Sequence, residues 1–398
     1  MTKFLGGFVL MIAAAHGGKP CWAQRIVGEI RPEKQVYLVG QPVFVVLDIA
    51  NKESKPIWIS ESCAWLDTQF EASTAPKPLP EVTLFGCGGG TAGSCGGSSA
   101  EVFPGTHYQK RYLLSGPFRL DSPGIYPIRA SHKVDIYAGG SSFQVIASQD
   151  LVSEFQLKLV EPTDEELLSA YEPVLRDLKS QDGYKRSLAL AAIVQHPPRV
   201  LEDVILSLAD HPQTAANSIS GLERLATPRA KARLAQLSGA DNPEAIRQMA
   251  ISALAALGDS EYCSSMLNIA QESSQYSRFI ALRSAGYVCG EKALPLLRSL
   301  LSAADKTLRF EIAYALGNSH SREAVPILIP LLLDTDSSVR SAAAVSLASL
   351  THRSSGNGVD DEEAAGRTYN DWVEWWTSKG VSAEVYSIDN CTESLPLP

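Results

Sequence analysis

The sequence predicts a chain of two parts, an antiparallel β-sandwich followed by an α-solenoid of stacked helical hairpins. Three observations support this fold class. Short apolar runs separated by Gly and Pro turns fill the first part, which is typical of strands. The pattern changes to a helical one after Pro162. Beyond that point arginines recur at one constant interval, at positions 247, 278, 309 and 340.

The composition is that of a folded protein with two or three hydrophobic cores. The chain has 398 residues, of which 45% are hydrophobic and 20% charged, and this is too hydrophobic for a disordered chain. Its 44 acidic residues outnumber its 35 basic residues, so the formal net charge is −9. An acidic chain repels phosphate backbones and anionic lipid surfaces. We therefore expect no nucleic-acid partner.

Residues 1–23 have the pattern of a cleavable secretory signal. Lys3 precedes an apolar run over residues 4–15, and the small residues Cys21 and Ala23 stand at the −3 and −1 positions of the expected cleavage site. The run is shorter than the about 20 apolar residues that a membrane helix needs. No leucine lies three residues before Cys21, which makes lipid anchoring the weaker alternative. We expect an exported protein, periplasmic or extracellular, without stable membrane insertion after signal cleavage.

Residues 24–162 are expected to form an immunoglobulin-like β-sandwich. Val45, Leu47 and Ile49 alternate with Val46 and Asp48, as in a strand with one buried face. Seven short runs without a helical period between them predict an antiparallel sandwich. The predicted strands are 35–40, 43–50, 56–60, 108–114, 125–131, 143–147 and 155–160.

The segment from Leu120 to Tyr126 resembles the edge turn of many secreted bacterial sandwich domains. In such domains a Pro-Gly pair, here Pro123-Gly124, turns the chain, and the tyrosine enters the next strand. The resemblance implies an architecture and no activity. We interpret His107, which precedes Tyr108, as a strand residue rather than a catalytic base.

A glycine-rich insert occupies residues 86–99. Its glycines suggest a phosphate-binding loop, but no Gly-Lys-Ser/Thr ending and no helical pattern follow them. We therefore expect a surface loop closed by a disulfide between Cys87 and Cys95. A long loop on a rigid sandwich is also a candidate recognition loop.

The helical part is predicted over residues 163–352. Thr163 has the position of a helix N-cap, and Glu166 is placed to reach back to it. Each arginine of the constant interval lies in the first helix of a hairpin, and Pro295 and Pro326 mark second helices in the same phase. Neither helix of a hairpin buries its apolar stripe alone, so the units must stack with a period of 31 residues.

The pattern from Ser338 to Leu350, preceded by Glu323 to Leu328, resembles the short HEAT-like, or armadillo-like, repeats that are also seen in phycobilisome-lyase-type proteins. The resemblance covers roughly residues 165 to 352. It implies an α-solenoid that works as a binding scaffold for a protein or peptide whose identity the repeats do not reveal. Bilin-lyase chemistry, a further implication, fits poorly with export because those relatives act in the cytoplasm.

The four arginines Arg247, Arg278, Arg309 and Arg340 suggest either an anion-binding stripe or a structural ladder. Carboxylates precede them at short spacing: Asp182, Asp305 and Asp336 lie four residues before an arginine of this phase, and Asp241 and Glu272 lie six before. A carboxylate at a helix start caps the helix and offsets the unfavourable arginine. We therefore expect a structural ladder that stabilises the repeats.

Six cysteines remain after removal of the signal, and in an oxidising compartment they are candidates for disulfides. Cys263 sits early in the second helix of one unit, and Cys289 follows the first helix of the next unit. Antiparallel helices would place both at the same edge of the stack, where a bridge is geometrically reasonable. By elimination, Cys63 and Cys391 are left as a pair. The candidate cysteines are Cys87, Cys95, Cys263, Cys289, Cys63 and Cys391.

Residues 353–380 are expected to form a loop and a capping helix, with residues 381–398 as a C-terminal tail. Trp372, Trp375 and Trp376 share one helix face, and the end of a solenoid needs a cover. We prefer a cap to an aromatic ligand platform. The acidic run 360–363 lacks the alternating ligands of a Ca²⁺ loop, so we assign it to the charge of a helix start. This ending resembles the final helix of secreted bacterial HEAT-like proteins.

No catalytic signature is found in the sequence. No histidine is followed by glutamate, no Cys-x-x-Cys or His-x-x-x-His pair offers a zinc site, and no Gly-x-Ser-x-Gly marks a nucleophile. We expect no cofactor and no enzymatic activity. The predicted function is that of an exported protein-binding or scaffolding protein. The alternative is a secreted enzyme or inhibitor-like module whose activity resides in the sandwich and its Cys87–Cys95 loop.

Overall fold

The computed structural model describes two compact units of the chain. One ends at Leu188 and the other begins at Ala189. The described residues are 26–61, 68–72, 98–114, 120–137, 145–272, 275–302, 304–354 and 358–379. The expected signal 1–23, the tail 381–398, nearly all of the glycine-rich insert, and Cys63, Cys87, Cys95 and Cys391 lie outside them.

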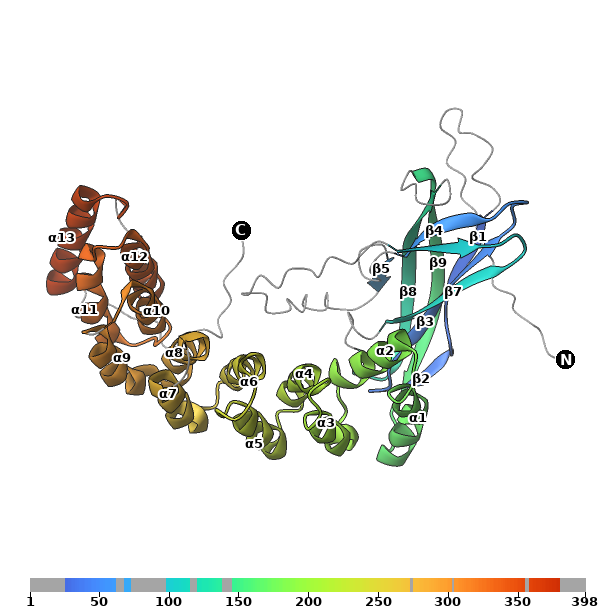
Figure 1. Ribbon diagram of the computed structural model, residues 1–398, viewed down its shortest axis with the longest axis horizontal. Helices are drawn as coiled ribbons and strands as arrows, with labels where there is room; N and C mark the ends of the chain where they lie inside the picture. The colour runs from blue at the N-terminus through green and yellow to red at the C-terminus, as the bar shows by residue number, and fades with distance from the viewer. Residues whose placement is uncertain are drawn as a thin grey trace. The chain divides into compact units, whose positions relative to one another are not determined.

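The first unit contains two β-sheets (Figure 1). The smaller sheet has the strand order β1-β3-β7, and the larger one has the order β2-β9-β8-β4-β6 with β5 also paired to β8. The strands are β1 (Ile26–Pro32), β2 (Val36–Leu38), β3 (Phe44–Asn51), β4 (Ile57–Glu61), β5 (Thr68–Ala72), β6 (Ser98–Val102), β7 (His107–Leu113), β8 (Gly124–Tyr137) and β9 (Val145–Val160).

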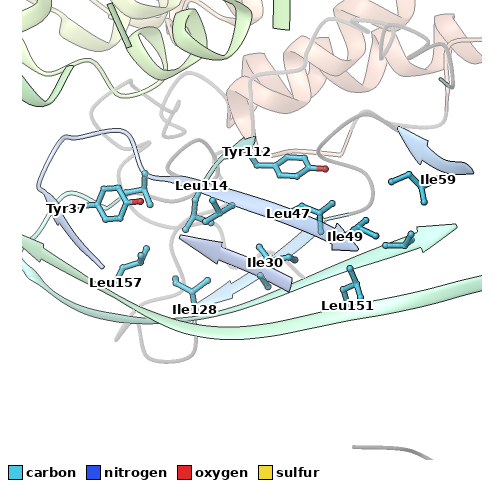
Figure 2. Close-up of a cluster of buried hydrophobic side chains, with 14 of the residues drawn as sticks. Ile30, Tyr37, Leu47, Ile49, Ile59, Tyr112, Leu114, Ile128, Leu151 and Leu157 are labelled. Carbon is cyan, nitrogen blue, oxygen red and sulfur yellow. The ribbon is translucent and has the colours of Figure 1, made fainter. Parts of the chain in front are cut away.

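Alternating side chains of both sheets form one hydrophobic core. Leu47 and Ile49 of β3 face the larger sheet, where Ile128 and Leu157 come from β8 and β9 (Figure 2). All four are buried, with at most 2% of their surface exposed. Since alternate residues of a strand point to opposite faces, the period-two pattern of the sequence places this core.

The strands differ from the prediction in number, length and one pairing. β1, β5 and β6 are additional strands, and the predicted strands 143–147 and 155–160 are parts of one strand, β9. The segment between them includes polar residues such as Asp150 and Glu154, which nevertheless pair with β8. β2 pairs with β9 in parallel, so the larger sheet is not wholly antiparallel. The number, length and direction of these strands depend on pairing between segments distant in the sequence, which a local pattern does not reveal.

Helix α1 (Asp164–Asp177) belongs to the first unit. The capping box predicted at Thr163 and Glu166 is confirmed: the Glu166 amide donates to the threonine hydroxyl at 3.2 Å, and the glutamate carboxylate accepts from the Thr163 amide at 2.9 Å. The buried Tyr171 hydroxyl donates to the Gly40 carbonyl at 2.8 Å. The chain thus changes from strand to helix near Pro162, but the compact units divide only after Leu188.

The second unit is a row of short helices. Figure 1 shows α4, α6, α8, α10 and α12 along the inner side of this row, which we call the inner row, and α3, α5, α7, α9 and α11 along its outer side. The helices from α2 onward are α2 (Gly183–Val194, which spans the division between units), α3 (Glu202–Leu208), α4 (Ala215–Leu225), α5 (Pro228–Leu237), α6 (Glu244–Ala256), α7 (Cys263–Glu272), α8 (Gln275–Cys289), α9 (Leu294–Leu301), α10 (Lys306–Gly317), α11 (Val325–Leu328), α12 (Ser337–Thr351) and α13 (Glu362–Ser378). Short 3-10 turns, η2 (Arg199–Leu201), η3 (Ser260–Tyr262), η4 (Gly290–Ala293), η5 (Arg322–Ala324) and η6 (Ile329–Leu333), connect or extend them.

Neighbouring inner-row helices pack very closely. A Cβ atom added to Gly286 of α8 would lie 2.1 Å from the carbonyl oxygen of Ala315 in α10, and one added to Gly317 of α10 would lie 2.5 Å from the Ser346 hydroxyl of α12. The Ser346 hydroxyl donates to the Ala313 carbonyl at 2.9 Å. These contacts need glycine because no side chain fits between the helix backbones.

Proline stands where the sequence predicts it. Pro295 and Pro326 lie in the first turn of α9 and α11, where the missing amide proton has no helical acceptor. Across the ranges that the structure describes, no helix is both long enough and apolar enough to cross a membrane.

Candidate functional site

Arg309 and Arg340 are tied to the turns between helices. Arg309 forms two hydrogen bonds with Asp334, at 2.7 Å and 2.8 Å, and a third to the Ala304 carbonyl at 3.0 Å. Arg340 is buried and donates to the carbonyl oxygens of Val359 and Asp360 at 2.7 Å and 2.9 Å. Both side chains satisfy backbone or carboxylate acceptors of their own unit.

The other two arginines of the ladder make comparable contacts. Arg278 donates to the Ala270 carbonyl at 2.9 Å. Arg247, which is 7% exposed, forms an ion pair with Glu244 one turn earlier at 3.1 Å. The row of arginines therefore offers little free charge to an anion.

The expected capping role of Asp305 and Asp336 is confirmed, but the carboxylate that pairs with Arg309 is a different one. Asp305 and Asp336 are helix N-caps and accept from the amides of Leu308 and Ser338, at 2.8 Å and 3.0 Å. The aspartate that pairs with Arg309 is Asp334, from the turn after the following helix. The spacing in the sequence predicts the helix caps. It does not predict Asp334, because the stacking of the helices brings this residue close to Arg309.

The local charges set the acidity of Asp334. Burial raises the pKa of this carboxyl, but hydrogen bonds from Arg309 and from the Asp336 amide outweigh burial and hold its pKa below the ordinary value. Asp334 is therefore ionised in the folded protein well into the acidic range.

Among the remaining carboxylates of the predicted ladder, Asp182, Asp241 and Glu272, only Asp182 has a clear role in the structure. Asp182 accepts from the amides of Tyr184 and Lys185 at 2.9 Å and 3.2 Å and so caps α2. Asp241 lies exposed in the turn before α6, and the side chain of Glu272 lies outside the described residues.

Cys263 and Cys289 form a disulfide, with their Cα atoms 5.1 Å apart. Cys263 begins α7 and Cys289 ends α8, so the bridge joins adjacent hairpins at one edge of the row. The other four candidate cysteines lie outside the described residues.

Helix α13 closes the last hairpin. Trp372 is 1% exposed and packs edge-on against Trp375, with ring centroids 5.4 Å apart. The Arg353 guanidinium lies over both rings, at 5.0 Å and 5.2 Å from their centroids. Trp376 is half-buried near Arg322. Trp372 thus packs in the interior, as a cap requires.

A groove lies between α10 and α12 on the inner row. It has a volume of about 460 Å³ and is lined by Phe310, Tyr314, Ser337, Ser338, Ser341, Ala342, Val345 and Asp360. The rings of Phe310 and Tyr314 meet edge to face, with centroids 4.9 Å apart. The sequence did not single out these residues, although Tyr314 and Val345 are separated by 31 positions, the same interval as the arginines.

Exposed apolar side chains also occur on other helices of the inner row. Met249 of α6, Tyr276 and Tyr287 of α8, and Val345 of α12 are between 38% and 69% exposed. Exposed apolar side chains that form a contiguous patch mark an interaction surface more often than singly scattered ones do.

The sheet surface of the first unit holds a polar cluster around Asp48. Its carboxylate contacts His107 Nδ1 at 2.7 Å and accepts from Gln109 at 2.6 Å. Burial raises the pKa of Asp48, but the hydrogen bonds from His107 and Gln109 bring it below the ordinary value. His107 is the first residue of β7, so it is a strand residue as expected.

The described residues were also compared with the requirements of a metal site. Among the described residues, no three His, Cys, Asp or Glu side chains lie close enough together to hold a metal ion.

Comparison with known proteins identifies the helical row. A family model described as HEAT repeats matches residues 263–348, which run from α7 into α12. No curated protein matches the chain.

Solved structures resemble the chain only loosely. An engineered protein is 18% identical, with 52% of this chain and 90% of that one covered and a TM-score of 0.27. Alpha-2-macroglobulin of Escherichia coli, activated by porcine elastase, is 12% identical, with 88% of this chain covered and a TM-score of 0.18. The chain spans 31% of the length of that protein. Similarities at this level carry no argument about function. The comparisons thus show that the chain contains HEAT repeats.

Proposed function

We propose that this protein is an exported, non-enzymatic scaffold that binds another protein or peptide through the inner row of its helical unit. In this proposal the first unit is an immunoglobulin-like sandwich that serves as a second contact or an anchor. The helical unit repeats with a period of 31 residues, and the arginine ladder stabilises the stack.

The HEAT-repeat match supports a binding role for the helices. HEAT repeats are commonly protein-interaction scaffolds, because stacked hairpins present a long continuous surface. The matched residues include α8 and α10 and most of α12.

One observation carries the proposal: the inner row exposes aromatic and aliphatic side chains where a surface without a partner is expected to be polar. Tyr276 is 69% exposed and Val345 is 53% exposed. Burial of apolar area is the main source of free energy in protein association. By contrast, the arginines of the ladder are engaged within the unit.

Site-specific photo-cross-linking tests the proposal in the full chain. A benzophenone amino acid replaces Tyr276, Tyr287 or Val345 of the inner row in separate variants, expressed in the native host. Exposed positions outside the inner row, Arg298 of α9 and Leu333 of the 3-10 turn η6, serve as controls. We expect all three inner-row positions to give one common cross-linked protein that the control positions do not give.

The same experiment distinguishes the rival hypothesis of a secreted enzyme or inhibitor-like module. A benzophenone at Ile125 of β8, which is 65% exposed, reports on the first unit. Cross-links at Ile125 alone, with none from the inner row, would contradict the scaffold proposal and favour a function of the sandwich.

A further inference from the structure

The groove between α10 and α12 combines apolar walls with a negative charge. We propose that it binds a short segment of the partner protein in which a lysine or arginine stands next to an aliphatic or aromatic residue. This inference rests on the proposed function, because it names the partner chemistry of the same surface.

The walls of the groove suit an apolar side chain. Phe310 and Tyr314 present two rings in edge-to-face contact on one side, and Val345, 53% exposed, stands on the other. A groove of about 460 Å³ has room for a few side chains and not for a folded domain. Aromatic rings also attract cations at their faces, and the Arg283 guanidinium already lies 5.1 Å from the Tyr314 ring centroid.

The cations around the groove are engaged within the unit. Arg278 of α8 donates to the Ala270 carbonyl, and Arg340 of α12 donates to the carbonyls of Val359 and Asp360. The three other basic side chains of α8 and α10 each have an acidic partner. The pairs are Arg283 with Glu311 at 3.1 Å, Arg309 with Asp334 at 2.7 Å, and Lys306 with Asp336 at 3.6 Å. None of them leaves a net positive charge for an anionic ligand.

Asp360 brings a carboxylate to the lining of the groove. Its side chain is exposed and lines the groove, while its backbone carbonyl accepts from Arg340. Among the described residues its carboxylate forms no ion pair. The segment 358–379 that it belongs to has six acidic and two basic residues. The edge of the groove is therefore negative and complements a cationic segment.

Charge argues against two other occupants. A second copy of this chain would bring the same acidic segment to the groove, and like charges would repel. Residues 380–398 of the chain contain three acidic residues and no lysine or arginine, so their charge also opposes that of Asp360.

Fluorescence anisotropy with labelled peptides tests the inference on the full chain. One peptide has a Leu-Lys-Phe-Arg centre between Gly-Ser flanks, a second has Glu in place of Lys and Arg, and a third has Ser in place of Leu and Phe. We expect the first peptide to bind about tenfold more tightly than either of the others at low salt, and less tightly as salt rises.

Matched variants locate the binding. Val345→Ser removes an apolar wall and Asp360→Asn removes the charge, and each is expected to weaken the first peptide several-fold. The controls Leu333→Ser and Asp371→Asn change exposed residues outside the groove and should leave binding unchanged. Thermal unfolding of each variant confirms that it is folded.

Several results would overturn the inference. These are equal binding of the cationic and acidic peptides, equal effects of the groove variants and their controls, tighter binding of a peptide of residues 380–398, or a dimer in sedimentation that Val345→Ser dissociates. If cross-links from the inner row still identify one partner, the scaffold proposal stands and only the cationic preference fails.

Discussion

The two units of this protein differ in the sequence range of the contacts that stabilise each of them. In the first unit, β8 pairs with β9 over nearly its whole length, and the buried core draws side chains from strands more than 100 residues apart in the chain, such as Ile30 and Leu157. In the second unit, each helix packs on neighbours close in sequence, as Gly286 does on Ala315. A destabilising substitution should therefore affect all strands of the first unit, whereas in the second unit its effect should stay within neighbouring hairpins.

The largest effect is expected from the hydrophobic core of the first unit. Leu47→Ala removes a side chain that is 2% exposed and should lower the free energy of unfolding of the first unit by about 3 kcal/mol. Hydrogen exchange followed by mass spectrometry should show faster exchange in all strands of the unit and unchanged exchange in α8, α10 and α12. Faster exchange confined to β3 would contradict the long-range picture.

A smaller but more local effect is expected in the inner row. Gly286→Ala forces a methyl group against the Ala315 backbone and should cost the second unit about 2 kcal/mol. The control Gly366→Ala places a methyl group in open space on α13 and should stabilise the protein by about 0.5 kcal/mol. Equal effects of the two substitutions in denaturant unfolding would show that the helices do not approach as closely as described.

Asp334→Asn tests the ion pair between repeats and its pH dependence. Breaking the Arg309–Asp334 pair should lower the free energy of unfolding by about 2 kcal/mol at pH 7. Because the pKa of Asp334 is lowered in the folded protein, the pair contributes fully above the ordinary carboxyl pKa, about 4, and the contribution is lost as pH falls below that value.

Urea unfolding of the wild type and of Asp334→Asn at several pH values measures this dependence. The difference between the two proteins should be constant from pH 7 to about pH 5 and shrink below about pH 4. A difference that stays constant into the acidic range would mean that Asp334 is not stabilised as an anion.

The smallest effect is expected at the start of α1. Thr163→Ala removes the N-cap hydroxyl and should lower the free energy of unfolding by about 1 kcal/mol. Since Tyr171 ties α1 to Gly40, the loss should be measured in the transition of the first unit. A change only in the second unit's transition would place α1 with the helical row instead.

Local signals were predictable from the sequence, and contacts between distant segments were not. The capping box of Thr163 and Glu166, the strand core at Leu47 and Ile49, and the pairing of Cys263 with Cys289 depend on short spacings or on a regular repeat. β5 and β6 have few apolar residues and are defined by pairing with β8 and β4, so no local pattern indicated them.

The candidate site shows the same division. The interval of the arginines was evident, but the choice of Asp334 as the partner of Arg309 depends on how the hairpins stack. Phe310, Tyr314 and Val345 occupy ordinary helix positions, and only the packing of α12 beside α10 makes them the walls of a groove. The separation of 31 positions between Tyr314 and Val345, equal to the interval of the arginines, was the one signal that pointed to two of them.

Cross-linking from the inner row tests the central claim most directly. We predict that a benzophenone at Val345 captures one defined protein in the native host, and that the same group at Leu333 of η6, outside the inner row, does not capture it. Capture of the same proteins from both positions, or from neither while Ile125 succeeds, would contradict the claim that the inner row is the binding surface.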